Sequence, residues 1–141
     1  AGANPTKAEA RVTAAAAGPV IFSDQGMVFQ DLDADGFIGT GWTLLYMHMG
    51  SEGRAPVGAE LAVGDPIGHP SCEGGYSDAS HLHFARRYNG VWIAAAHPRW
   101  PLVLSGWTAS GGATEYDGAL TREGVVKVAA ETWADVNAIT H

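Results

Sequence analysis

His81-Leu-His-Phe-Ala-Arg-Arg-Tyr-Asn-Gly-Val-Trp-Ile93 is the stretch of sequence that decides the fold. Leu82–Tyr88 has the composition of a β-strand, and Val91–Ile93 has that of a second one. Asn89-Gly90 lies between them and is the strongest short hairpin signal in the chain, because both residues tolerate the positive φ of a two-residue turn. The stretch therefore predicts two adjacent antiparallel strands.

Short strands are also predicted on both sides of this hairpin. They are expected at Val20–Phe22, Met27–Leu32, Trp42–Met49, Leu102–Leu104 and Trp107–Thr108. Val12–Ala17 is compatible with a helix or a strand, and Val125–Ile139 with a strand followed by a short helix. Nineteen Gly and seven Pro among 141 residues favour many turns. We therefore expect an antiparallel all-β or β-rich fold with long loops.

Composition also divides the chain and excludes some classes of protein. Ser110–Thr114 has the composition of a flexible linker, so we expect a β domain over residues 1–110 and a less regular C-terminal extension, of unknown role, over residues 111–141. A net charge of −7 does not suit a nucleic-acid binder. No apolar run approaches the roughly 20 residues that span a bilayer, and no signal peptide is recognised. Cys72 is the only cysteine, which excludes an internal disulfide and a Cys-rich zinc site. The oligomeric state is not indicated.

Three histidines are candidates for chemistry. His81 and His83 are two residues apart on a predicted strand, so their imidazoles point to the same face. That geometry suits one zinc ligand with a catalytic neighbour, or two ligands, and it also suits two surface histidines. His48 lies in an otherwise apolar strand, where a hydrogen-bonded core histidine is the alternative. If the two strands are neighbours, three imidazoles converge, which packing alone does not explain.

Asp31-Leu-Asp33-Ala-Asp35-Gly36 is a second candidate metal site. Its carboxylates alternate as in the first half of a calcium-binding loop, with Gly at the sixth position. The twelfth position is Trp42 rather than Glu, so the full EF-hand pattern is absent. Calcium binding and an acidic hairpin turn are both compatible with this segment.

The order of four motifs resembles the lysostaphin-type metalloendopeptidases, especially their staphylolysin and beta-lytic protease branch. The motifs are Val12-Thr-Ala-Ala-Ala-Ala-Gly-Pro-Val20, Tyr46-Met-His48, Gly64-Asp-Pro-Ile-Gly68 and His81-Leu-His-Phe84. Each motif is weak alone, whereas four in the right order are fairly specific. The resemblance runs from Val12 to Ile93 and implies the antiparallel sheets of a lysostaphin-type peptidase domain.

The resemblance also implies roles for individual residues. His83 matches a zinc ligand, and His81 matches a general base or transition-state stabiliser. His48 matches the other catalytic histidine, and Tyr46 the aromatic residue beside it. The implied protein is a zinc-dependent hydrolase of peptidoglycan peptides, secreted by a bacterium to the cell envelope or the medium. Zinc in such a site lowers the pKa of its bound water to about 7.

The sequence departs from the family at the remaining two ligands. A His-x-x-x-Asp motif is expected upstream of Val12, with its Asp near Ala1–Asn4, and Ala1-Gly-Ala-Asn4 contains neither residue. The family's Ser-Thr-Gly-Pro is replaced by Ser77-Asp-Ala-Ser80. Because catalytic zinc uses about three protein ligands, two functions stay open. One is an enzyme, and the other is a non-catalytic module that binds cell wall or another cell-surface partner, or a structural subunit of an extracellular assembly.

Overall fold

The computed structural model describes residues 10–114, 117–130 and 139. Within these residues the regular structure consists of β-strands alone. The chain divides between Ile93 and Ala94 into two units, the first with two sheets and the second with one. The predicted all-β fold with antiparallel sheets is therefore confirmed.

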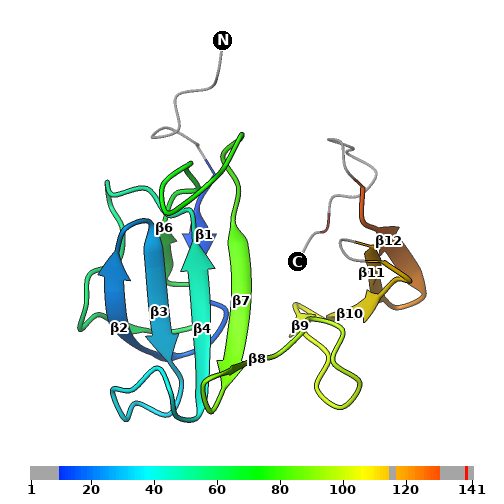
Figure 1. Cartoon of the computed structure of the whole chain (residues 1–141), viewed down its shortest axis with the longest axis horizontal. Coiled ribbons are helices and arrows are strands. Elements are labelled where there is room, and N and C mark those ends of the chain that lie inside the picture. Colours follow the sequence, from blue (N-terminus) through cyan, green and yellow to red (C-terminus); the bar gives the residue numbers. More distant parts are fainter. Residues whose placement is uncertain (1–9, 115–116, 131–138, 140–141) are drawn as a thin grey trace. The chain divides into compact units, whose positions relative to one another are not determined.

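A six-stranded antiparallel sheet forms most of the first unit (Figure 1). In spatial order its strands are β5 (Glu60–Leu61), β2 (Gly18–Asp24), β3 (Met27–Asp31), β4 (Trp42–Met47), β7 (His83–Tyr88) and β8 (Val91–Trp92). The predicted hairpin forms between β7 and β8, where Asn89 and Gly90 have φ of 46° and 78°. Both values lie in the left-handed region that a two-residue turn of this kind requires.

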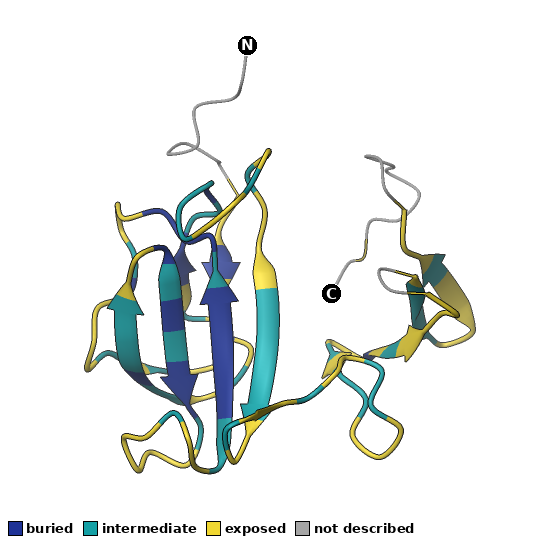
Figure 2. Ribbon diagram, viewed as in Figure 1, coloured by how far each residue is buried: buried dark blue, intermediate teal, exposed yellow. Residues whose placement is uncertain are grey.

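A small second sheet covers the core of this unit. It pairs β1 (Val12–Thr13) with β6 (Pro66–Gly68) and lies behind the large sheet in Figure 1. Val12 and Ile67 from this sheet join Val20, Val28 and Tyr46 from the large sheet in one buried apolar cluster. Figure 2 shows the buried residues along β1, β3 and β4. The core therefore lies between the two sheets.

The register of β4 against β7 positions the candidate site. Tyr46 pairs with Phe84, and Met47 pairs with His83. The C-terminal end of β4 therefore lies beside the N-terminal end of β7. The neighbouring strands that the histidine hypothesis required are present.

The second unit is a four-stranded antiparallel sheet. Its spatial order is β12 (Val125–Val128), β11 (Gly118–Arg122), β10 (Trp107–Gly111) and β9 (Val103–Leu104). Since β9 pairs with β10, residues 94–110 belong with this sheet, whereas composition alone placed a boundary after residue 110. Ser110 and Gly111, expected in a linker, are the last residues of β10.

A helix was one of two alternatives for Val12–Ala17 and was expected within Val125–Ile139, and the outcomes differ. Val12–Ala17 contains only the short strand β1 and no helix. The short helix expected within Val125–Ile139 falls largely on residues 131–138, which lie outside the described residues. In the part of the chain that the structure describes, no helix has the length and hydropathy to cross a membrane.

Candidate functional site

Three imidazoles converge where β4 ends and β7 begins. The ring centroids of His48 and His81 are 4.5 Å apart, and those of His48 and His83 are 6.3 Å apart. His48 is buried, whereas His81 and His83 are exposed. The cluster is thus open to solvent on one side and backed by the protein on the other.

Backbone carbonyls fix the tautomers of two of these imidazoles. Nδ1 of His48 lies 2.7 Å from the carbonyl oxygen of Glu73, and Nδ1 of His81 lies 2.9 Å from that of Ala79. A carbonyl oxygen only accepts, so each Nδ1 donates a proton. In the neutral ring Nε2 then carries the lone pair, as it does in histidines that bind a metal or take up a proton.

The backbone of His48 has a left-handed conformation with φ of 66°. Such values are uncommon for residues other than Gly. This residue follows the last residue of β4, so the strand's alternation of side chains is broken at this point.

Tyr46 belongs to the core. Its side chain is 1% exposed, and its ring lies 5.2 Å from that of Phe84. The phenol donates to Oε1 of Gln30 at 3.1 Å and accepts from the amide of Ala15 at 2.9 Å. Burial raises the pKa of this phenol above its ordinary value, because a phenolate is poorly solvated there. The catalytic role implied for Tyr46 by the resemblance stays a prediction.

The imidazoles suit zinc in chemical type, since neutral histidine nitrogen is one of its common ligands. In spacing they do not complete a site. Among the described residues, three potential ligand atoms lie within 4.8 Å of one another only at Asp31, Asp33 and Asp35, and not at the histidines. The positions near Ala1–Asn4, where the resemblance places a further ligand, lie outside the described residues.

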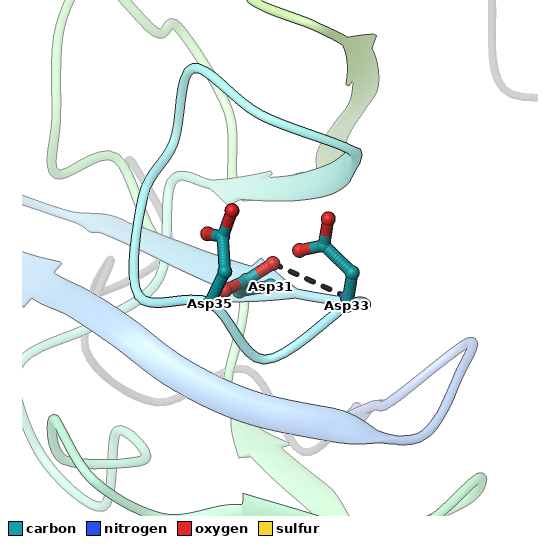
Figure 3. A group of neighbouring side chains, drawn as sticks. All are labelled: Asp31, Asp33 and Asp35. Atoms are coloured by element: carbon teal, nitrogen blue, oxygen red, sulfur yellow. Dashed lines mark hydrogen bonds between the residues drawn. The ribbon is translucent and has the colours of Figure 1, made fainter.

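The acidic turn does bring its three carboxylates together (Figure 3). Asp31 is buried and accepts from the amides of Asp33 and Gly36, at 3.3 and 2.8 Å. Asp35 accepts from the hydroxyl of Thr40. The pKa of Asp33 is raised, first by its hydrogen bond with the Asp31 carboxyl, then by desolvation and by repulsion from Asp35 and Asp31. Calcium at this turn stays a prediction.

The sequence did not single out Ser71 and Glu73, which form hydrogen bonds to His48. Ser71 is fully buried, and Glu73 provides the carbonyl that accepts from the His48 ring. Both are far from His48 in sequence and belong to no recognisable motif. Between them lies Cys72, a half-buried free thiol, which stands out in the sequence because it is the only cysteine.

No family model matches the sequence, and no curated protein matches it. Among solved structures, pseudoalterin from the deep sea, an M23 metalloprotease, is similar with a TM-score of 0.66 and 22% identity. The match covers 85% of this chain and 70% of that chain. This chain has the fold of an M23 metalloprotease. The first unit, residues 1–93, makes up less than 85% of the chain. The match therefore also includes residues of the second unit.

Proposed function

We propose that the chain is the core of a lysostaphin-type zinc endopeptidase that cleaves peptides of bacterial peptidoglycan, outside the cell or in the cell envelope. The observation that supports this proposal is the convergence of His48, His81 and His83 in a fold shared with an M23 metalloprotease. Three imidazoles at the open end of two strands, two of them with Nδ1 bound to a carbonyl, are better explained by a chemical role than by packing.

His83 would hold the zinc ion, together with ligands from outside the described residues. When bound, zinc would polarise the scissile carbonyl and make water acidic enough to supply hydroxide near neutral pH. His83 is exposed at the start of β7, which leaves its ring accessible to an ion and to further ligands.

His81 and His48 would accept protons during hydrolysis and return them. Each donates Nδ1–H to a carbonyl, so each has Nε2 available to accept a proton and return it. Their environments differ, since His81 is exposed and His48 is buried. His81 is therefore the more accessible group for exchange with solvent, and His48 the more rigidly placed one.

A hollow that includes Glu73, the residue bound to the His48 ring, would receive the peptide. It has a volume of about 520 Å³ and is lined by Gln25, Met27, Glu73, Gly74 and Gly75. Glu73 is also the residue whose carbonyl binds His48, so the hollow and one of the imidazoles share this residue. Two of its lining residues are glycines, and an added Cβ at Gly74 would lie 2.7 Å from the carbonyl oxygen of Gln25, so this side of the hollow is closely packed.

The alternative is a non-catalytic module that binds cell wall or another surface partner. It is favoured by one observation, that the described residues do not complete a group of three zinc ligands at the histidines. The two functions differ in metal content and in hydrolysis.

The test measures zinc per chain by elemental analysis and peptide release from peptidoglycan. We expect His83→Ala to lose zinc, and His81→Ala to keep zinc and lose hydrolysis. His97→Ala is the control, since His97 lies in the second unit and stacks on Trp100. Retention of both zinc and hydrolysis by His83→Ala would refute the assignment. A wild type that neither binds zinc nor hydrolyses would favour the binding module.

A further inference from the structure

The left-handed backbone of His48 must be held by its surroundings, because a non-glycine residue does not favour that conformation. Its side chain is 3% exposed and lies 4.5 Å, ring to ring, from His81. The groups that stabilise this backbone therefore also determine where the imidazole lies.

Ser71 binds the carbonyl group of His48 twice. Its amide donates to that oxygen at 2.6 Å, and its hydroxyl donates to the same oxygen at 3.0 Å. The Ser71 side chain is fully buried. Both bonds are therefore shielded from competition with water, and they fix the peptide unit that follows His48.

Glu73 binds the imidazole of the same residue. Its amide donates to the Ser71 hydroxyl at 3.0 Å, and its carbonyl accepts from Nδ1 of His48 at 2.7 Å. Ser71 and Glu73 thus form a closed cycle of hydrogen bonds with His48. This cycle binds the backbone carbonyl of His48 through Ser71 and the imidazole of His48 through Glu73.

The Glu73 side chain connects this cycle of hydrogen bonds to the loop that contains Ser51 and Arg54. One carboxylate oxygen accepts from the amide of Ser51 at 2.9 Å, and the other lies 3.8 Å from the Arg54 guanidinium. Arg54 also donates to the carbonyl of Met49 at 3.1 Å, which is the residue after His48. The position of Glu73 is therefore fixed by its own side chain as well as by Ser71.

We propose that Ser71 and Glu73 are positioning residues that hold His48 in its left-handed conformation and in the Nδ1–H tautomer. The ring then presents an unprotonated Nε2 beside His81 and His83. The significance of this for catalysis rests on the proposed peptidase function, whereas the effect on the ring itself does not.

The test measures the tautomer of His48 in the full chain without zinc, by long-range ¹H–¹⁵N NMR of the imidazoles. At about pH 8.5 ordinary histidines are neutral, so the two tautomers are compared without the charged form. We expect the wild type to have His48 in the Nδ1–H form. Ser71→Ala should lower the ratio of Nδ1–H to Nε2–H about fivefold or more, the change that corresponds to one net hydrogen bond.

Thr43→Val is the matched control. Thr43 is nearly as buried as Ser71, and its hydroxyl donates to the carbonyl of Ile38 at 3.2 Å, near the end of β4 that lies away from His48. This variant loses a part-buried hydrogen bond from a hydroxyl to a carbonyl and should leave the His48 tautomer unchanged. An equal shift in both variants would mean that general destabilisation, rather than positioning, moves the tautomer, and would overturn the proposal.

Glu73→Ala keeps the test decisive if Ser71→Ala does not fold, because the Glu73 side chain is partly exposed. It should shift the tautomer in the same direction by a smaller factor. A folded Ser71→Ala, or failing that a folded Glu73→Ala, with the wild-type tautomer ratio overturns the proposal. If the wild type itself neither binds zinc nor hydrolyses peptidoglycan, the peptidase function is refuted. The inference about the His48 ring is unaffected by that result.

Discussion

Replacing Tyr46 with Phe removes a single oxygen atom from the core. The phenol lies between a donor, the amide of Ala15, and an acceptor, Oε1 of Gln30. Gln30 is fully buried, and its amide nitrogen already donates to the carbonyls of Ala16 and Gly18. The variant therefore leaves two polar groups without the partner that now satisfies them.

The expected cost follows from these two bonds. A buried donor or acceptor that loses its partner costs about 1–3 kcal/mol. We take the lower part of that range for each group, because the Ala15 amide is only partly buried. Tyr46→Phe should then lower the free energy of unfolding by about 2–4 kcal/mol. For a domain of this size that corresponds to a fall in Tm on the order of 10 °C.

The pH dependence provides a second signature. Burial raises the pKa of Tyr46, so the folded chain keeps this proton at a pH where the unfolded chain releases it. That contribution to stability is complete below the ordinary tyrosine pKa of about 10 and is lost as the pH rises through the folded value. Phe has no such contribution, so the stability gap between wild type and variant should narrow above about pH 10.

Urea unfolding followed by tryptophan fluorescence measures both effects. Tyr76→Phe is the control, because that tyrosine is 94% exposed. A cost for Tyr46→Phe within about 0.5 kcal/mol of the control would refute the reasoning. Peptide release per folded molecule, measured in parallel, decides whether Tyr46 is catalytic. Full loss of hydrolysis with unchanged stability would support the role that the family resemblance implies.

Three further predictions concern the turns. The pKa of Asp33 is raised, so the charged carboxylate is less favourable in the folded chain than in the unfolded chain, and Asp33→Asn should raise the free energy of unfolding at pH 7. This gain in stability should vanish as the pH falls to the ordinary carboxyl pKa of 3.8. Urea unfolding at several pH values tests this. Calcium at millimolar concentration should raise the Tm of the wild type more than that of Asp33→Asn, and an unchanged wild-type Tm would contradict the calcium hypothesis. Gly26→Ala should destabilise the chain more than Gly36→Ala in thermal unfolding. Both glycines have positive φ, but an added Cβ would lie 2.6 Å from Glu73 at the first and meet no atom within 4 Å at the second. An equal fall in Tm for both variants would mean that the positive φ, and not the close approach of Glu73, determines the loss of stability at these turns.

Local features of the sequence were sufficient for the hairpin and most strands. Asn89-Gly90 specifies its turn through the backbone conformations of two residues, so no distant contact is needed to predict it. The proximity of His48 to His81 was only a hypothesis from the sequence, because it depends on which strands are neighbours. The pairing of β4 with β7 supplies that information.

One feature of the site and one of the unit boundary could not be predicted from the sequence, because each depends on distant contacts. Strict alternation would place the side chains of Tyr46 and His48 on the same face of β4. The left-handed backbone at His48 breaks that alternation, and it is stabilised by Ser71 from a distant loop. Likewise, residues 94–110 join the second unit through the pairing of β9 with β10, which composition does not reveal.

The pairing of β4 with β7 also has a consequence for how the chain acquires its site. β2, β3 and β4 follow one another directly, whereas β4 and β7 are separated by the segment 48–82. Closing that loop costs more entropy than forming the short hairpins, so we expect the three consecutive strands to associate first. In pulsed hydrogen exchange, amides of β3 should gain protection before those of β7. A newly made chain would then pass through a stage that has three of the six strands of its large sheet and none of its imidazole cluster, and the cluster would form only when β7 joins β4.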